Sequence, residues 1–368
     1  MRIMIAAGGT GGHVYPALAA AEAMITRTPT VSLSFVGSVG GFERPLIAES
    51  AVSFTTYDEV RAGPLHGVGL PRMALSLVQL AFGTLQALAL MLRRRPQALL
   101  LTGGWVGLPV AVAAWLFRVP SMIFVPDIEP GLSIRVLRRF ARRVALTVAD
   151  SRSYFPGQST VVTGYPVRAQ MRSASRSEAV EYFHLDPTRK TLLVFGGSRG
   201  ARAINNALLD MLPQLLSDGV QVIHVTGTLD WADIEARHKA LPDASHYHAF
   251  PYLHREMGLA MAAADLVVSR AGASILGEFP LFHLPAVLIP YPHAWRYQRV
   301  NADYLSSRGA AIRLDEEKLP SELLPLIRSL LNDPARLDAM RAASGALALP
   351  DAADHLAREL TQLAGGQA

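Results

Sequence analysis

The chain has 368 residues, enough for two domains of ordinary size, and half of them are apolar. Only 18% are charged, so the composition is that of a folded protein and excludes a disordered one. The absence of cysteine from the sequence excludes a disulfide framework, a thiol nucleophile and a thiolate metal site. The apolar run at residues 1–8 is too short for a signal peptide, so we expect a cytoplasmic protein.

Positive charge is concentrated in the first half of the chain. Residues 1–168 hold 16 Arg, no Lys and 8 acidic residues, a net charge of +8, whereas the remainder has 19 basic and 22 acidic residues. This asymmetry favours an anionic partner for the first half, either a phosphorylated ligand or a membrane surface. Nucleic acid is not expected, because the basic residues are not interleaved with aromatic residues and no known reading motif is present.

The chain opens with a strand followed by a glycine-rich turn. Residues 1–7 predict a buried strand, GGTGGH follows at residues 8–13, and a helix is expected over residues 14–24. His13 therefore stands where ligands of open parallel sheets bind, although a lone histidine there is more often a capping or packing residue. The glycine spacing is not the dinucleotide fingerprint, which disfavours a nicotinamide enzyme.

A second strand–glycine–helix junction lies in the middle of the chain. An apolar strand is expected at residues 191–195, GGSRGA follows at 196–201, and residues 202–209 have helical periodicity. Backbone N–H groups at such a turn can hold a phosphate, and Ser198 and Arg199 add hydroxyl and guanidinium donors. One such turn is also common as a plain structural feature, so the pair is more informative than either alone.

Strands and helices alternate through both halves. Strands are expected at residues 31–37, 53–57, 98–101, 121–125, 144–148 and 159–162, and again at 191–195, 220–225, 246–250, 265–268 and 286–290. This alternation predicts an α/β protein with two doubly wound parallel sheets. We expect an N-terminal domain at residues 1–163, a C-terminal domain at 164–345, and a last helix at about 346–368 that packs back on the first domain.

Two elements of the first half are candidates for membrane contact. Residues 73–92 contain 15 apolar residues of 20, with one stripe formed by Ser76, Gln79, Gly83 and Gln86. We expect an amphipathic helix with a wide apolar face rather than a span, although core packing also explains such a helix. A helix over residues 133–143 would place four arginines on one face, either solvated or against anionic lipid: Arg135, Arg138, Arg139 and Arg142.

Six motifs occur in order along the chain. They are GGTGGH at 8–13 with Pro16, GGW at 103–105 with Pro109, GYPVR at 164–168, GGSRGA at 196–201, SRAGA at 269–273 with Glu278, and PYPH at 290–293 with Gln298, Asn301 and Ala302. Together they resemble the MurG family of lipid-linked peptidoglycan-precursor N-acetylglucosaminyltransferases, in glycosyltransferase family 28. The resemblance covers most of residues 1–315.

The resemblance implies a fold, a reaction and a location. The fold is GT-B, with two Rossmann-like doubly wound domains facing a central cleft. The reaction is inverting transfer of N-acetylglucosamine from UDP-N-acetylglucosamine to undecaprenyl-diphospho-muramoyl-pentapeptide, lipid I to lipid II, in peptidoglycan synthesis and cell wall biogenesis. The location is the cytoplasmic face of the cell membrane, as a peripheral protein on the anionic inner-membrane surface.

The resemblance also implies roles for single residues. Glu278 would accept hydrogen bonds from the ribose hydroxyls, Ser198 would contact a phosphate, and Gln298 would contact the sugar. Backbone around Leu253 and His254 would hold the uracil edge, and Arg168 and Arg270 would lie near the diphosphate and sugar. The expected substrate-binding residues are Thr10, Gly11, Gly12, Arg168, Ser198, Arg199, Leu253, His254, Arg270, Ala273, Glu278 and Gln298.

Inverting transfer needs a base near the acceptor hydroxyl. His13, Asp127 and Glu129 are the candidates, with His13 first because its position matches the family and Asp127 second. Two helix N-termini and Arg168 can stabilise the diphosphate. The sequence has no D-x-D triplet or His/Asp ligand cluster, so we expect no metal ion and no cofactor besides the UDP-sugar substrate.

The acceptor half departs from the family pattern more than the donor half. Residues 124–127 read FVPD where the family usually has His-Glu-Gln-Asn, only Gln298 remains of a glutamine pair, and His283 stands where small residues are usual. Three alternatives therefore stay open: a related GT-B transferase with another lipid or small acceptor, a UDP-sugar 2-epimerase, and a non-catalytic UDP-sugar-binding protein. The sequence does not define the oligomeric state.

Overall fold

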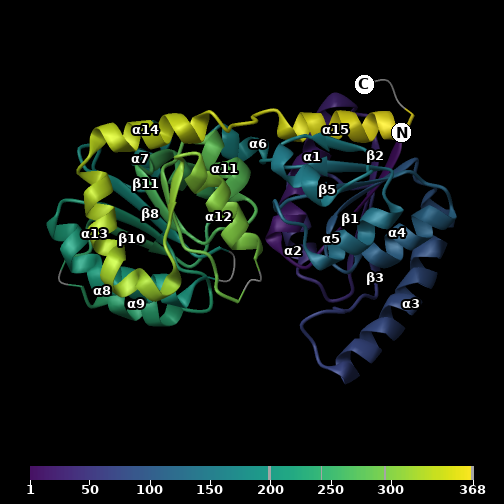
Figure 1. The fold of residues 1–368 in the computed structure, drawn as a ribbon, viewed down its shortest axis with the longest axis horizontal. Helices are drawn as coiled ribbons and strands as arrows, with labels where there is room; N and C mark the ends of the chain where they lie inside the picture. Colours follow the sequence, from purple (N-terminus) through teal and green to yellow (C-terminus); the bar gives the residue numbers. More distant parts are fainter. Residues whose placement is uncertain (198–199, 242, 294–295, 366–368) are drawn as a thin grey trace. The chain divides into compact units, whose positions relative to one another are not determined.

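The computed structural model describes residues 1–197, 200–241, 243–293 and 296–365. The chain divides into two compact units. The first comprises Met1–Arg168 together with the C-terminal segment that begins at Leu349, and the second is Ala169–Ala348. Each unit contains one parallel sheet with helices packed on it (Figure 1).

The first unit is built on a seven-stranded parallel sheet in the order β3-β2-β1-β4-β5-β6-β7. The strands are β1 (Arg2–Ala7), β2 (Ser32–Ser38), β3 (Thr56–Val60), β4 (Ala98–Gly103), β5 (Ser121–Val125), β6 (Arg143–Leu146) and β7 (Thr160–Val162). The central strands β1, β4 and β5 are buried almost throughout. Their continuous Ile, Leu, Met, Val and Ala runs suit a parallel sheet that is covered on both faces.

Helices cover this sheet on its two faces. They are α1 (Gly11–Arg27), α2 (Glu43–Ala48), α3 (Leu70–Arg94), α4 (Gly107–Leu116), α5 (Leu132–Leu137) and α15 (Ala352–Leu363). The last helix packs against α1, β4 and β5. The alanines at positions 17 and 19–21 of α1 are buried and leave room for α15, which an ion pair between Arg143 and Glu359 also anchors.

The expected helix over residues 133–143 is wrong. Helix α5 ends at Leu137, a 3-10 turn spans Arg138–Phe140, and Ala141 is extended, so that the Arg142 N–H joins the sheet by donating to the carbonyl of Ser121 at 2.8 Å. Strand pairing therefore overrides helical periodicity here, and the four arginines do not form one helical face.

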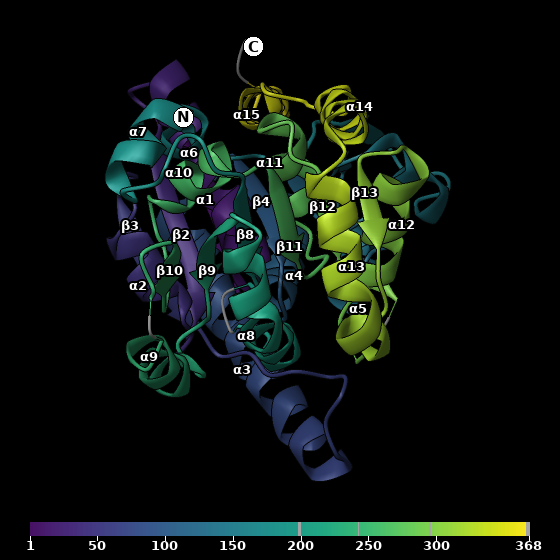
Figure 2. The same cartoon turned by 90° about the vertical axis from the view of Figure 1, so that its left-hand side faces the viewer.

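Helix α3 turns its small and polar stripe inward. Ser76 and Gly83 are buried, the Gln86 Oε1 accepts the Arg61 N–H at 2.9 Å, and a Cβ at Gly83 would lie 2.0 Å from the Arg61 carbonyl oxygen. The large apolar side chains face outward instead, at positions Leu70, Leu75, Leu77, Val78, Phe82, Leu85 and Leu92. Figures 1 and 2 show the amino-terminal end of α3 reaching beyond its sheet. Core packing accounts for only one side of this helix.

The second unit contains a six-stranded parallel sheet in the order β10-β9-β8-β11-β12-β13. The strands are β8 (Thr191–Phe195), β9 (Gln221–Val225), β10 (Tyr247–Phe250), β11 (Leu266–Ser269), β12 (Ala286–Leu288) and β13 (Ala311–Arg313). Only β13 was not expected from the sequence.

Nine helices of the described chain belong to the second unit. They are α6 (Ala169–Arg172), α7 (Arg176–Tyr182), α8 (Arg202–Ser217), α9 (Trp231–Lys239), α10 (Met257–Ala263), α11 (Ile275–Leu281), α12 (Tyr297–Ser307), α13 (Leu319–Leu331) and α14 (Pro334–Gly345). The apolar faces of α8 and α13 supply most of the helical side of the core, against Leu192, Val194 and Val222 of the sheet.

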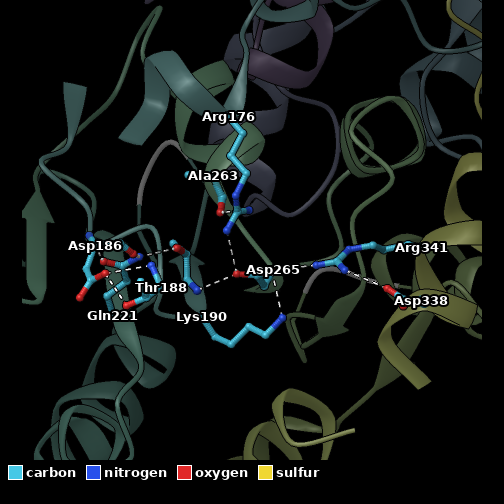
Figure 3. Close-up of polar contacts among 10 residues, drawn as sticks. Arg176, Asp186, Thr188, Lys190, Gln221, Ala263, Asp265, Asp338 and Arg341 are labelled. Atoms are coloured by element: carbon cyan, nitrogen blue, oxygen red, sulfur yellow. Dashed lines mark hydrogen bonds and ion pairs between the residues drawn. The ribbon is translucent and has the colours of Figure 1, made fainter. Parts of the chain in front are cut away.

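A buried carboxylate ties the amino edge of this second sheet together (Figure 3). Asp265, whose side chain is 6% exposed, pairs with Arg341 at 2.9 Å, Arg176 at 3.2 Å and Lys190 at 3.8 Å. It also accepts the Thr191 N–H at 2.9 Å. One carboxylate thus connects α7, α14 and the starts of β8 and β11.

Asp265→Asn should destabilise the fold, because it leaves three clustered cations without their anion. We expect the free energy of unfolding to fall by about 2–4 kcal/mol, measured by chemical denaturation. Asp338→Asn is the matched control, since Asp338 is 71% exposed and pairs with Arg341 only locally. It should change stability by less than about 0.5 kcal/mol. Equal effects of the two variants would contradict the structural role of Asp265.

Candidate active site

Both sheets have a point where the strand order reverses. In the first sheet it lies between β1 and β4, and in the second between β8 and β11. At such a point neighbouring crossover connections diverge, which leaves a crevice outside the carboxyl ends of the two strands. The glycine turns at residues 8–13 and 196–201 follow β1 and β8, so each unit carries its turn at this crevice.

His13 is held in a defined orientation at the first of these points. Helix α1 begins at Gly11, three residues earlier than expected, so His13 lies in its first turn. The imidazole rests against Gly103 after β4, where φ is +131° and a Cβ would be 2.5 Å from the His13 Cδ2. Only glycine therefore allows the ring this position.

The hydrogen bonds of His13 determine which ring nitrogen carries the proton. Its Nδ1 lies 3.0 Å from the Gly8 carbonyl oxygen and 3.2 Å from the Thr10 hydroxyl. A carbonyl oxygen only accepts, so Nδ1 must be the protonated nitrogen of the neutral ring. The lone pair is then on Nε2, which is the atom that can take a proton from a substrate.

Burial lowers the pKa of His13, and this effect is larger than the opposing effect of the hydrogen bond to Gly8. The imidazole is therefore neutral at physiological pH, as a general base has to be. The side chain keeps partial exposure to solvent. Geometry and charge state thus leave the Nε2 of His13 able to accept a proton.

The first turn of α1 is supported from two other places in the first unit. Thr102 at the end of β4 donates its hydroxyl to the His13 carbonyl at 2.7 Å. Because Pro16 has no N–H, the carbonyl of Gly12 lacks its helical donor. The buried Tyr165 hydroxyl lies 3.4 Å from that oxygen.

Arg168 lies beside the same turn. Its guanidinium carbon is 4.4 Å from the ring centroid of Tyr15, and that ring in turn packs against Gly11. The structure thus brings together the helix N-terminus formed by residues 10–13 and one arginine. Both favour negative charge on a ligand.

The two acidic candidates lie beyond β5, on the same edge of the sheet as His13. Glu129 is buried and accepts from the Arg135 Nη2 at 2.8 Å, while the Arg135 Nε donates to the Pro130 carbonyl. Glu129 is therefore engaged as an ion-pair partner. Asp127 is half-buried, two residues beyond the end of β5.

The glycine turn of the second unit is tightly packed. Gly197 and Gly200 have φ of +90° and +77°, and a Cβ at Gly200 would lie 2.4 Å from the Thr226 carbonyl oxygen. The turn leads into α8, a helix long enough for its N-terminus to attract a phosphate. Ser198 and Arg199, the expected phosphate ligands, lie outside the described residues.

A buried polar network lies behind this turn. The amide Nδ2 of Asn205 donates to the Thr226 carbonyl at 2.9 Å and to Asp230 at 3.0 Å, and its Oδ1 is 3.0 Å from the His224 Nε2. The His224 Nδ1 meets the Tyr247 hydroxyl at 2.8 Å. The network supports the backbone against which Gly200 packs.

Arg270 and Gln298 meet at Tyr291. Arg270 is nearly buried, its guanidinium lies 5.1 Å from the Tyr291 ring centroid, and it forms an ion pair with Glu316. Gln298 accepts the Tyr291 N–H through its Oε1 at 2.9 Å. Both expected ligands thus hold the loop after β12, and the charge of Arg270 is already balanced by a carboxylate.

The remaining expected donor residues follow β10 and β11. Ala273 precedes α11, and Glu278 lies within this short helix, half-buried, with its N–H bonded to the Ser274 carbonyl at 2.9 Å. Leu253 is buried and His254 is exposed, and the His254 N–H donates to the Glu256 Oε2 at 3.1 Å.

Two features bear on what the site can hold. Among the described residues, no group of three or more His, Asp or Glu side chains is placed to hold a metal ion. A cavity of about 200 Å³ lies at the amino ends of β1 and β2, lined by residues that include Arg2, Ser32 and Arg93. Since it is at the opposite edge of the sheet from His13, we do not assign it to the site.

Sequence reasoning missed two residues that support the site, Asn205 and Glu43. Asn205 was recognisable as a polar residue on the apolar stripe of α8 formed by Ile204, Leu208 and Leu212. Glu43 is an acid just beyond the glycine turn that follows β2, and nothing in its local sequence marks it as buried.

Comparisons with known proteins bear on the identity of the chain. Residues 3–146 match the glycosyltransferase family 28 N-terminal domain, and residues 191–356 match the family's C-terminal domain. A UDP-N-acetylglucosamine–N-acetylmuramyl-(pentapeptide) pyrophosphoryl-undecaprenol N-acetylglucosamine transferase of Roseiflexus sp. (strain RS-1) is 41% identical, over 97% of this chain and 94% of that protein.

Similar solved structures agree with this family assignment. The MurG crystal structure from Acinetobacter baumannii has a TM-score of 0.76 and 25% identity, over 98% of this chain and 99% of that one. A UDP-N-acetylglucosamine 2-epimerase from Neisseria meningitidis has a TM-score of 0.70 over 98% of this chain and 100% of that one, but at 11% identity it shows the fold alone. The expected GT-B fold and family resemblance are confirmed.

The ionisation of His13 can be measured directly. Because burial lowers its pKa, the imidazole should titrate at lower pH than an ordinary histidine and be neutral at pH 7, with the proton on Nδ1. Nitrogen-15 NMR across a pH titration reports both quantities, and the His13→Asn variant assigns the resonance. A ring that is protonated at pH 7, or that carries its neutral proton on Nε2, would contradict this geometry.

Proposed function

The chain belongs to glycosyltransferase family 28, and on that premise we propose how it carries out its reaction. It is a UDP-N-acetylglucosamine-dependent N-acetylglucosaminyltransferase that converts undecaprenyl-diphospho-muramoyl-pentapeptide, lipid I, into lipid II in peptidoglycan synthesis. The observation that carries this function is the 41% identity, over 97% of the chain, to a relative that bears the name of this transferase.

The proposed chemistry is a single displacement. The acceptor hydroxyl gives its proton to the His13 Nε2 while its oxygen bonds to the anomeric carbon, and the bond from that carbon to the UDP oxygen breaks. UDP leaves with the electron pair, and the configuration at the anomeric carbon inverts. The orientation of His13 supports the role of base, and Asp127 at the end of β5 is the alternative.

The departing diphosphate gains negative charge that has to be stabilised. We assign this to the N-terminus of α8, which supplies backbone N–H groups at the glycine turn after β8. Within the first unit, the N-terminus of α1 and Arg168 offer groups of the same kind. Arg270 contributes less in this proposal, because Glu316 already balances its charge. No metal ion is part of the scheme.

We assign the donor nucleotide to the second unit. Glu278 accepts from the ribose hydroxyls, Leu253 and His254 present backbone to the uracil edge, and Gln298 contacts the sugar. The support is the family position of these residues together with their placement beyond the carboxyl ends of β10, β11 and β12.

Two variants separate these roles in one assay of acceptor-dependent UDP release. His13→Ala should lower kcat by about 10²-fold or more with little change in donor affinity. Glu278→Ala should weaken UDP binding by about 1.5–3 kcal/mol in calorimetry, because charge-assisted hydrogen bonds are lost.

Glu322→Ala on α13 is the control for Glu278, because Glu322 is an exposed carboxylate that forms an ion pair with Lys318 one helical turn away. If Asp127→Ala abolishes turnover and His13→Ala does not, the base is Asp127. Unchanged UDP affinity in Glu278→Ala would remove the ribose assignment.

The lipid-linked acceptor requires the enzyme to reach a membrane, and we assign this contact to the outer face of α3. Leu75, Val78 and Leu85 of that face are between 57% and 67% exposed. Helix α4 packs against α3, and the exposed run Trp115, Leu116, Phe117 lies at its carboxyl end. By length and composition α3 is also apolar enough to span a membrane, but its inward stripe packs on residues 61–63, which supports a peripheral position.

Vesicle co-sedimentation tests this contact. Replacing Leu77, Val78 and Leu85 with Gln should abolish binding to anionic liposomes, because apolar insertion is lost. Arg93→Gln should weaken binding more at low salt than at high salt, by about 1 kcal/mol. Arg94 is unsuitable as a probe, since it is already bound to Asp58.

The control is Leu229→Gln, at an apolar position of the second unit that is 73% exposed. Binding that survives the triple α3 change, or that falls equally with Leu229→Gln, would show that α3 is not the contact.

A further inference from the structure

Glu43 is buried close to the site without a cationic partner among the described residues. It is 1% exposed, at the start of α2. Its Oε1 accepts the Gly9 N–H at 3.2 Å, and the Ser38 hydroxyl lies 3.5 Å from the same oxygen. Its Oε2 has no hydrogen-bond partner within the part of the chain that the structure describes. Burying a carboxylate with so few hydrogen-bond donors costs free energy.

One peptide group connects Glu43 to His13. The Gly9 N–H that Glu43 binds and the Gly8 carbonyl that His13 binds belong to the same peptide unit. The order is therefore carboxylate, peptide, imidazole, with contacts of 3.2 Å and 3.0 Å. Hydrogen bonds in such a chain polarise one another, because charge at one end strengthens the acceptor at the other.

We propose that Glu43 is a positioning residue for His13, acting through the Gly8–Gly9 peptide. Its negative charge polarises that peptide, so the Gly8 carbonyl holds the Nδ1 proton and stabilises the imidazolium formed when Nε2 takes the acceptor proton. The role matches that of the aspartate in a Ser-His-Asp triad, with a peptide group inserted between carboxylate and ring. The inference rests on the proposed role of His13 as base.

The surrounding glycines make room for this arrangement. A Cβ at Gly8 would lie 2.3 Å from the Glu43 Oε1, and one at Gly41 would lie 1.7 Å from the Oε2. Any side chain at either position would displace the carboxylate. The glycine turn after β1 thus brings backbone close to the Glu43 carboxylate.

Other charged and titratable groups around Glu43 and His13 do not supply the negative charge that we assign to Glu43. Tyr57 interacts with Glu43, Glu59 and Arg44, and burial, followed by Glu59 and Glu43, raises the pKa of Tyr57 to about 12. Tyr57 is therefore uncharged across the neutral range. On the other side, Gly8, Thr10 and Gly103 contact the imidazole, and none of these three residues carries an ionisable side chain.

The test is Glu43→Gln, which keeps an oxygen acceptor for the Gly9 N–H and removes the charge. Without that charge the imidazolium is less stable, so the pKa of His13 should fall. A base must be unprotonated to act, so the acidic limb of the kcat/KM profile should move to lower pH, and kcat on the plateau should drop about tenfold. Glu43→Asp keeps the charge and should leave the limb near its wild-type position.

Glu59→Gln is the matched control, because it removes a carboxylate from the same neighbourhood without touching the Gly8–Gly9 peptide. Thermal unfolding shows whether each variant folds. A purely structural role predicts lower stability and turnover with no movement of the limb, and that result would overturn the proposal. So would equal movement in Glu43→Gln and Glu59→Gln.

Nitrogen-15 NMR of His13 separates this proposal from the proposed function. The imidazole titration needs no substrate, so a lower pKa in Glu43→Gln supports the connection even if the chain fails to transfer sugar. An unchanged titration in an active enzyme would reject the connection and leave the function standing. If Glu43→Gln does not fold, Ser38→Ala tests the same carboxylate: it removes a neutral donor from Oε1, so more of the negative charge acts on the Gly8–Gly9 peptide and the pKa of His13 should rise slightly, and a fall would contradict the proposal.

Discussion

The fold of both units depends on one constraint: neighbouring parallel strands have to be connected by helical crossovers. Each crossover returns the chain to the amino edge of the sheet, so the carboxyl ends of strands and the N-termini of helices gather at the opposite edge. The strand order reverses at β1/β4 and at β8/β11, and both glycine turns follow these strands. Backbone geometry thus places N–H groups and His13 at the crevice before any side-chain chemistry is considered.

Buried carboxylates serve different purposes according to their partners. Asp265 pairs with three cations and stabilises the fold. It lies at the amino edge of its sheet, whereas the glycine turn lies at the carboxyl edge. Glu129 is matched by Arg135. Within the described chain Glu43 has only neutral donors, and it is the one that connects to His13. Because no salt bridge among the residues that the structure describes neutralises this anion, its charge acts on the neighbouring peptide and imidazole.

Much of the fold was predictable because the signals are local. The strands β1 and β8 and both glycine turns follow from apolar runs that end in glycine. Tertiary contacts determine the rest. Residues 142 and 143 pair with the sheet instead of extending α5, and β13 is only three residues long. Glu43 was not predictable, because its burial depends on Gly8 and Gly41, which lie on separate turns. The orientation of α3 also depends on contacts, since its polar stripe packs on residues 61–63.

The central claim is that the reaction is a single displacement at the anomeric carbon, in which a base of the enzyme takes the proton of the acceptor hydroxyl. The configuration of the new glycosidic bond tests it most directly. The sugar is α-linked in UDP-N-acetylglucosamine, so one displacement must give a β-linked disaccharide. Proton NMR of the lipid-linked product should show the large axial–axial coupling of a β-anomer. A retained α-linkage would require a second displacement and a covalent or dissociated intermediate, and would contradict the account of His13 as base.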